Sequence, residues 1–586
     1  MSNQTSAFKI GINMAGAVSA GAYTAGVLDF LTEALDAWYA AKARGEAVPS
    51  HDVSIEVMSG ASAGGMCAAI SSVMLQENFQ HINHPQERHT PLPEGTVPNR
   101  LFESWVNKID IHKLLNTHDV KHANSVVSLL DSTIIDQIAE YSLAPATLMS
   151  PPRPYVSPSL TLFLSLTNLR GTPYSLNGAA PGSVEETAFF FGDRIKFQVL
   201  KSGEATPQSA SAHGLDLKKA GAEGGWDLLQ TAAKATGAFP VFLAPRILNR
   251  NLYEYTPPMW ESVASEMEGT PPPISPTFPP DTPNPIATLN VDGGITNNDP
   301  FNYAHDFLAK LDPPRTHKSD AVTAIDTDRA VINVAPFPTI DKFDVDYDPK
   351  EHTGVFSAIG ALFSALVSQS RFLGESLDQI MRGTTFDRFV IAPSDAELIE
   401  EYKGKKQKEQ PAALQCAVFG AFGGFFHRGF RAHDYALGRR NCQKFLLDSF
   451  VLPKSNVIMK AALEGMDPAM CQTVLDNFKR SDPGNYAEDS PLRSEEEWLP
   501  IIPLCSKTVS DEIPHIRRVK MTKAEVNQIV DGVLQRYKAL ILIFLSMIPS
   551  MKLRVFLRIG QPVIRFFAKK PLTDSLIKNL GDSYQD

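Results

Sequence analysis

A serine among small residues has the local pattern of a nucleophile. Ser62 lies in GASAG, between the apolar run IEVMSG and the alanine-rich segment MCAAISSVM. A G-x-S-x-G turn between a strand and a helix holds a serine in a strained conformation, because only small neighbours let the two elements approach closely. Gly60, Ala61, Ala63 and Gly64 meet that demand. The pattern alone also fits a glycine-rich loop in which Ser62 caps the helix.

A second glycine-rich turn precedes this serine, in GINMAGAVSAGAYTAGVL, residues 11–28. Backbone N–H groups at the start of a helix are suited to stabilise the oxyanion of an acyl-transfer reaction. Nucleotide binding is the competing interpretation, but GAVSAG is not followed by Lys-Ser or Lys-Thr and no GxGxxG is present. We therefore favour the oxyanion interpretation.

An aspartate follows a third apolar run, in NVDGGITNNDP, residues 290–300. Asp292 could accept the proton of a serine hydroxyl directly, as a general base that needs no histidine. Taken alone, an aspartate before two glycines is more typical of a turn in which the carboxylate accepts backbone N–H groups. Asp292 is a candidate general base because its motif follows the serine motif in the chain.

The three motifs, in this order, resemble those of the patatin-like phospholipase family. GASAGG is similar to the family's G-x-S-x-G elbow, VDGG to its D-G-[GA] motif and GAYTAGVL to the downstream half of its oxyanion loop. TGAFPVFLAPR (236–246) is similar to a segment upstream of the family's catalytic aspartate, and the resemblance covers roughly residues 8–340. Two further stretches resemble a bacterial branch of the family, LTNLRGTPYSL and FGGFFHRGFRAHDYALGRRNCQKFL.

The resemblance implies a three-layer α/β fold with a mainly parallel central sheet, and hydrolysis of phospholipids or other lipid esters without a cofactor or a metal. It makes Ser62 the nucleophile and Asp292 the general base, with Gly60 and Gly64 shaping the nucleophile elbow. The oxyanion hole would consist of four backbone N–H groups, those of Gly16, Ala17, Val18 and Ser19.

The oxyanion loop departs from the family pattern. The family loop usually has the sequence G-G-G-x-[KR]-G, whereas residues 16–21 are GAVSAG and lack two glycines and the basic residue. If the hole needs a positive φ at position 17 or 18, Ala17 or Val18 is strained there. We therefore expect the geometry of the hole, and the reaction rate with it, to differ.

Three alternatives remain open. A Ser-Asp-His hydrolase would need a histidine after the acid, and candidates are His305, His352, His427 and His433. A lipid-binding or scaffolding protein that has lost activity is the non-enzymatic alternative, although both Ser62 and Asp292 are retained. Metal binding is weakly indicated, since DVDYD (344–348) lacks the glycine and glutamate of a calcium loop, and since His81, His84 and His89 lie in a proline-containing loop without a fixed helical spacing.

The strands that would position these motifs can be recognised from apolar runs. We expect strands at 8–14, 160–169, 286–294 and 329–337, and a helix after each glycine turn. Proline-rich insertions are expected at 76–100, 149–158 and 258–285. We predict a catalytic core over 1–345, a helical extension over 346–450 and a mostly helical C-terminal region over 451–586.

Composition agrees with a globular protein and limits its partners. The chain has 586 residues, 43% of them hydrophobic, and a net charge of -10, which disfavours nucleic acid as a partner. Five scattered cysteines favour a reducing, cytoplasmic location. Residues 9–31 resemble a signal peptide but continue into a helical pattern, so we assign them to the fold. No apolar run approaches about 20 residues, so no membrane span is predicted.

The segment 536–570 stands out in an acidic chain. It carries eight basic residues and no acid, interleaved with ALILIFLSMIPSM and several phenylalanines. Such a segment suits a membrane surface rich in anionic lipid. It equally suits a helical hairpin that packs its apolar side on the core, and the sequence leaves both open. The sequence carries no signal for the oligomeric state.

Overall fold

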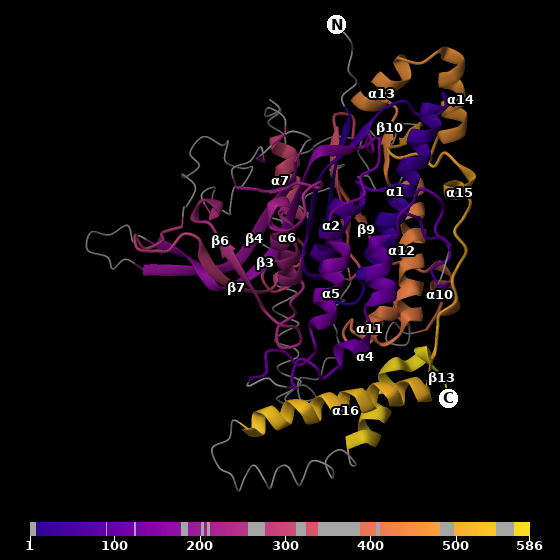
Figure 1. Cartoon of the computed structure of the whole chain (residues 1–586). Coiled ribbons are helices and arrows are strands. Elements are labelled where there is room, and N and C mark those ends of the chain that lie inside the picture. The colour runs from indigo at the N-terminus through magenta and orange to yellow at the C-terminus, as the bar shows by residue number, and fades with distance from the viewer. Residues whose placement is uncertain are drawn as a thin grey trace.

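A mixed sheet forms the centre of the molecule. The computed structural model describes residues 7–585 except 89–90, 122–124, 177–185, 201–203, 205, 208–210, 256–275, 312–323, 338–386, 406–410, 481–496 and 547–567. Helices pack against both faces of the sheet (Figure 1). Its strands are β1 (Phe8–Met14), β2 (Val53–Gly60), β3 (Val156–Leu176), β4 (Glu186–Val199), β5 (His213–Leu215), β6 (Arg246–Arg250), β7 (Ile286–Asp292), β8 (Arg329–Val334) and β9 (Arg388–Ile391).

The sheet is mostly parallel. Its strand order is β5-β4-β3-β2-β1-β8-β9, and β7 pairs with both β3 and β6. Strands β3, β2, β1, β8 and β9 run parallel to one another, and so do β4 and β5, whereas the pairs β3–β4, β3–β7 and β6–β7 are antiparallel. This arrangement, with helices on both faces, confirms the α/β fold expected from the sequence.

Two hydrophobic clusters cover the two faces of the sheet. The larger includes α1 (Gly21–Ala43), α2 (Ser62–Met74) and α6 (Trp226–Thr236). On the other face, α7 (Phe301–Lys310) packs Phe301, Ala304 and Leu308 against buried residues of β2, β3 and β8. Between α2 and β3 in the sequence, the chain also forms α3 (Arg100–Phe102), the π-helix η1 (Glu103–Lys108), α4 (Ile111–Leu114) and α5 (Thr133–Ser142).

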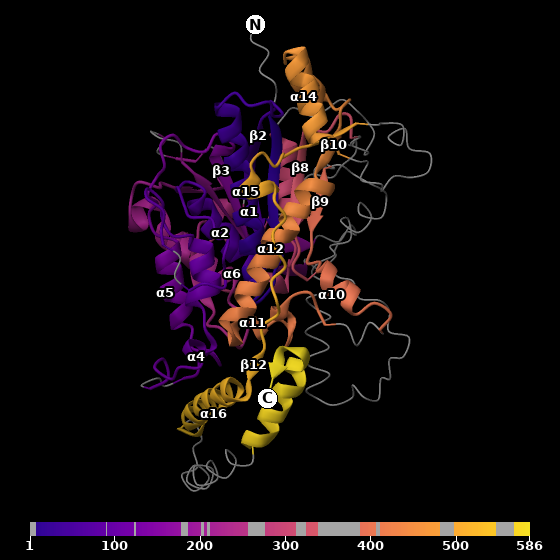
Figure 2. The same cartoon turned by 90° about the vertical axis from the view of Figure 1, so that its right-hand side faces the viewer.

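The long helix α12 (Arg428–Asp448) packs directly along α1 (Figure 2). The approach requires glycine on each side, because a Cβ on Gly26 would lie 1.9 Å from the Tyr435 carbonyl oxygen, and one on Gly438 would lie 2.2 Å from that of Tyr23. Buried Arg439 adds ion pairs to Asp29 and Glu33 of α1. Helix α12 is therefore part of the core.

The C-terminal part is mostly helical, as expected, with short strands. Its helices are α10 (Ala396–Glu401), α11 (Gly423–Phe426), α13 (Val457–Glu464), α14 (Pro468–Phe478), α15 (Lys507–Ser510) and α16 (Lys523–Ser546). Strands β10 (Val451–Pro453) and β11 (Trp498–Pro500) pair with each other, as do β12 (Met521–Thr522) and β13 (Tyr584–Gln585). Helix α16 lies beside α4 at one end of the molecule (Figures 1 and 2). Among the described helices, none has both the length and the apolar character needed to cross a bilayer.

Candidate active site

Ser62 occupies a strained turn between β2 and α2. Its φ is 53°, a left-handed value that is rare for a residue other than glycine. A Cβ on Gly60 would lie 2.6 Å from the backbone of Gly64, and one on Gly64 would lie 2.1 Å from the Met14 carbonyl oxygen. The Ser62 N–H donates to Thr236 Oγ1 at 3.1 Å. Small residues are thus required on both sides of the serine, as the GASAG motif indicated.

Asp292 ends β7, where that strand lies beside β3. A Cβ on Gly293 would lie 2.0 Å from the carbonyl oxygen of Ser165 in β3, so glycine is needed after the aspartate. Thr167 Oγ1 donates to the Asp292 carbonyl oxygen at 2.8 Å. These contacts fix the backbone of Asp292 against the sheet.

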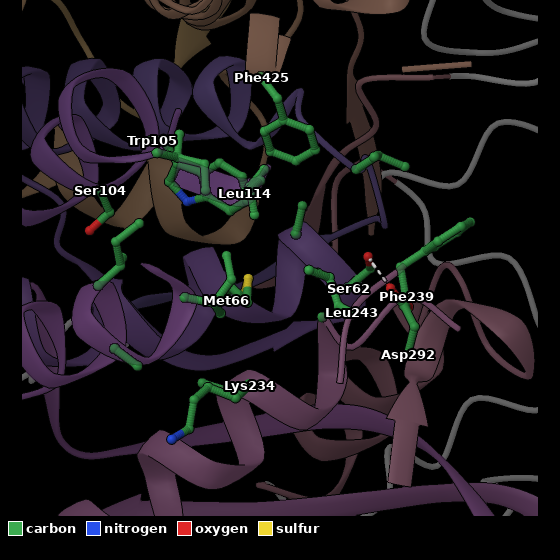
Figure 3. Close-up of a pocket in the computed structure, with 18 of the residues that line it drawn as sticks. Ser62, Met66, Ser104, Trp105, Leu114, Lys234, Phe239, Leu243, Asp292 and Phe425 are labelled. Atoms are coloured by element: carbon green, nitrogen blue, oxygen red, sulfur yellow. Dashed lines mark hydrogen bonds between the residues drawn. The ribbon is translucent and has the colours of Figure 1, made fainter. Parts of the chain in front are cut away.

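The serine and the aspartate meet directly. Ser62 Oγ donates a hydrogen bond of 2.6 Å to Asp292 Oδ2 (Figure 3), and the Gly294 N–H donates one of 2.7 Å to Oδ1. Both side chains are buried. Burial raises the pKa of Asp292 to about 7, although its two hydrogen bonds favour the charged form. A carboxylate with this pKa can exchange a proton near neutral pH.

The glycine turn between β1 and α1 lies against this pair. A Cβ on Gly16 would lie 3.2 Å from Ser62 Cβ and 2.2 Å from Asn298 Oδ1. The Gly16 N–H donates to the Asn298 carbonyl oxygen at 2.9 Å, and the Ser19 N–H donates to the Ala421 carbonyl oxygen at 3.2 Å. Two of the four N–H groups that the sequence suggested are therefore already bonded within the protein.

The other two N–H groups of this turn belong to Ala17 and Val18. Neither has a backbone acceptor among the described residues. Val18 has a φ of 49° and lines the pocket next to Ser62. The strain that the sequence analysis allowed at position 17 or 18 therefore falls on Val18.

An apolar pocket opens at Ser62. Along α2, Ser62, Met66 and Ile70 face it at intervals of four residues, so they lie on one side of the helix. Trp105, Ser104 and Lys234 lie on the side of the pocket away from Ser62 (Figure 3). The remaining wall is mostly apolar and comes from η1, α4, α5 and α6; it includes Ile109, Leu114, Ile135, Ile138, Leu143 and Ala233.

Four phenylalanines complete the pocket wall. Phe239 and Phe242 contact Phe422, with ring centroids 5.8 and 5.3 Å apart, and Phe425 packs against Phe422 at 5.9 Å. A role for these phenylalanines was not expected from the sequence. The only signal was that they lie in two stretches resembling the family and its bacterial branch, TGAFPVFLAPR and FGGFFHRGF.

The candidate histidines have partners other than Ser62. His305 contacts Asp306 and Asp387 at 3.4 and 3.3 Å. His427 accepts the Gly429 N–H and lies 3.4 Å from Glu525, and His433 pairs with Asp434 at 2.8 Å. His352 lies outside the described residues.

The candidate metal ligands form no shared site where they are described. His81 is held between Asp29 and Asp36; burial opposes the charged ring, but the two carboxylates raise its pKa to about 9. His89 and the segment 344–348 lie outside the described residues. In the described part of the chain, Asp395, Glu397 and His515 bring ligand atoms within 4.8 Å of one another, but Arg440 already pairs with Glu397.

The amino-acid sequence is similar to a known family and to a relative. The model of the family described as "Patatin-like phospholipase" matches residues 13–305, which include both Ser62 and Asp292. The chain belongs to the patatin-like phospholipase family. A relative from Sinorhizobium fredii (strain NBRC 101917 / NGR234), named "Uncharacterized protein y4iI", is 32% identical over 551 residues, which are 89% of this chain and 73% of that protein. The sequence similarity of this patatin-like chain to the relative therefore extends beyond residues 13–305 into the C-terminal part.

Proposed function

We propose that this patatin-like protein is a serine acyl hydrolase that cleaves carboxylic esters of lipids, with Ser62 as nucleophile and Asp292 as general base. The observation that supports it most strongly is the 2.6 Å hydrogen bond from Ser62 Oγ to Asp292 at the mouth of an apolar pocket. Family membership supports lipid acyl hydrolysis as the general class of reaction.

Acylation begins when Asp292 Oδ2 accepts the hydroxyl proton of Ser62 and Oγ attacks the ester carbonyl carbon. The carbonyl oxygen becomes an oxyanion, which the N–H groups of Ala17 and Val18 stabilise. The N-terminal end of α2 adds a favourable field at the same place. As the intermediate collapses, protonated Asp292 returns the proton to the leaving alkoxide, so an alcohol departs and the acyl group stays on Ser62.

Deacylation repeats these steps with water as the nucleophile. Asp292 accepts a proton from a water molecule while the water oxygen attacks the acyl carbon. The oxyanion then forms again in the same hole. Collapse releases Ser62 Oγ, which regains its proton from Asp292, and a free carboxylic acid leaves. One aspartate therefore serves as base and then acid in each half of the reaction.

The pocket supports a lipid as the source of the acyl group. Apart from Ser62 and Asp292, its lining is mostly aliphatic and aromatic, so an alkyl chain loses contact with water along its length when it enters. The hydroxyl of Ser62 lies where the chain would end in its carbonyl group. This geometry fits hydrolysis of phospholipids in the manner of a phospholipase A.

Single substitutions test this assignment. Ser62→Ala and Asp292→Asn should each lower ester hydrolysis by about a thousandfold or more, and the double variant should be scarcely slower, because the two residues act as one unit. His427→Asn is the matched control, since asparagine can still cap α12. Substantial activity in Asp292→Asn, or a loss in His427→Asn equal to that in Ser62→Ala, would contradict the dyad.

We further propose that α16 contributes to binding at an anionic membrane surface. Its inner side is packed, since Arg536 is buried against Asp119, and Leu540 and Ile543 form a small core with Val120. Its outer side exposes Tyr537 and Phe544, which are two helical turns apart, and Lys538 between them. Apolar and basic groups on one side of a helix suit a lipid interface. Residues 547–567 of the basic segment lie outside the described residues.

A further inference from the structure

The turn 16–19, called here the oxyanion turn, is bonded to a segment about 400 residues further along the chain. Ser19 is completely buried, and its hydroxyl donates a hydrogen bond to the carbonyl oxygen of Ala421. The Ser19 N–H donates to the same oxygen at 3.2 Å. Ser19 Oγ in turn accepts the N–H of Gly424 at 3.0 Å. One serine thus makes three hydrogen bonds to the segment 415–426.

Both sides of this contact contain unfavourable backbone conformations. Val18, next to Ser19, has a φ of 49°, and Phe419 and Ala421 have φ values of 57° and 74°. Residues with a Cβ adopt such values only where surrounding contacts hold them there. The three hydrogen bonds of Ser19 join these two strained stretches.

The segment 415–426 is itself fixed to the core. The Asp434 carboxylate in α12 accepts the N–H groups of Gln415 and Cys416, each at 2.8 Å. The fit around Ser19 is close, because a Cβ on Gly424 would lie 2.6 Å from Ser19 Oγ and 2.5 Å from Cys416 Sγ. The segment can therefore act as a rigid support for the oxyanion turn.

We propose that Ser19 is a positioning residue of the oxyanion hole, through its bonds to Ala421 and Gly424. Its hydroxyl fixes the conformation of Val18 in which the Ala17 and Val18 N–H groups are directed at the developing oxyanion. This support takes the place of the conformational freedom that the missing glycines would provide. The proposal rests on the proposed hydrolase function, and its supporting segment lies beyond the matched residues 13–305.

The same segment carries Phe422 and Phe425, which line the acyl pocket. The segment 415–426 therefore contacts the oxyanion turn and also lines the pocket proposed for the alkyl chain. Loss of the Ser19 contact should nevertheless affect the chemical step more than binding, since the aromatic wall is also held by Phe239 and Phe242.

The test compares Ser19→Ala with Ser72→Ala in the full-length protein. Ser72 is a buried serine of α2 whose hydroxyl also donates to a backbone carbonyl, that of Ala69, at 2.8 Å. Ser19→Ala should lower kcat on a soluble ester by roughly 10- to 100-fold with KM nearly unchanged, since loss of an oxyanion donor alone costs about 100-fold or more. Labelling of Ser62 by a fluorophosphonate should slow by a similar factor, and Ser19→Cys should recover part of the rate.

The outcomes separate this proposal from the hydrolase assignment. A kcat and labelling rate of Ser19→Ala equal to those of the wild type, or a loss matched by Ser72→Ala together with an equal drop in Tm, would overturn the positioning role while Ser62 still reacts. A wild-type protein that neither hydrolyses esters nor reacts at Ser62 would overturn the hydrolase function, and the positioning role with it.

Discussion

Ser62 Oγ and Asp292 Oδ2 lie 2.6 Å apart although the two residues are separated by 230 positions in the chain. Within the described part of the chain, no basic side chain donates a hydrogen bond to the Asp292 carboxylate; its other oxygen accepts the Gly294 N–H. Burial therefore dominates its titration and raises its pKa to about 7.

Activity should depend on the ionised form of Asp292. We expect kcat/KM for a soluble ester to be constant above about pH 7 and to fall about tenfold per pH unit below it, because only the carboxylate can accept the Ser62 proton. The substrate should carry no titratable group in this range. A profile that stays flat from pH 8 to pH 5 would contradict the assignment of the base.

The same carboxylate should make the wild-type protein less stable as the pH rises. The pKa of Asp292 in the folded protein lies above the usual value of 3.8. The free energy of unfolding is therefore highest below pH 3.8 and falls progressively as the pH rises from there to about 7. Asp292→Asn has no such titration. Its free energy of unfolding relative to that of the wild type should therefore increase by up to about 3 kcal/mol from pH 5 to pH 8.

Thermal unfolding of both proteins at several pH values measures this difference. The Tm of Asp292→Asn should rise relative to that of the wild type as the pH increases. A Tm difference that stays constant across this pH range would show that the buried carboxylate carries no such penalty.

Two positions on α2 should control the length of the acyl chain. Met66 and Ile70 lie about 6 and 12 Å beyond Ser62 along the helix axis, at about 1.5 Å per residue, and both line the pocket. Ile70→Trp should therefore lower kcat/KM for long-chain esters and spare short ones, whereas Met66→Trp should lower both. Equal losses for short and long chains in Ile70→Trp, at an unchanged Tm, would contradict the proposed direction of the chain.

The exposed side of α16 should support binding to anionic vesicles. Tyr537 and Phe544 are 48% and 51% exposed, so replacing both with serine should weaken co-sedimentation and leave hydrolysis of a short soluble ester intact. Val457→Ser is the control, because Val457 is 45% exposed on α13, at the other end of the molecule (Figure 1). Point substitutions are preferable to truncation at 536, since buried Arg536 bonds Asp119. Unchanged vesicle binding would favour packing as the role of this helix.

Local patterns predicted many of the core strands and indicated the two candidate catalytic residues. The apolar run 8–14 coincides with β1, and the runs at 160–169, 286–294 and 329–337 lie in or overlap β3, β7 and β8. These segments could be predicted because strand, glycine turn and helix differ in residue type over a few positions. Ser62 and Asp292 could be singled out because GASAG and VDGG each follow an apolar run and, taken in order, resemble motifs of the family.

Contacts between segments that are distant in the chain have no local sequence pattern from which they could be predicted. Strand β9 has four residues, too few for a period, and it lies in a region where we expected helices. The bond between Ser19 and Ala421 depends on how α12 packs on α1, and neither residue type indicates a partner about 400 positions away. The positive φ values of Val18 and Ala421 could not be predicted either, because tertiary contacts impose them against local preference.

Covalent labelling of Ser62 tests the central claim most directly. The wild type and Asp292→Asn would be treated with a fluorophosphonate from pH 5 to pH 9, and the modified residue identified by peptide mass spectrometry. We expect modification at Ser62 in the wild type, at a rate that rises to a plateau above about pH 7, and a rate at least about a hundredfold lower in Asp292→Asn. Modification at another residue, or equal rates in the two proteins, would contradict a catalytic dyad of Ser62 and Asp292.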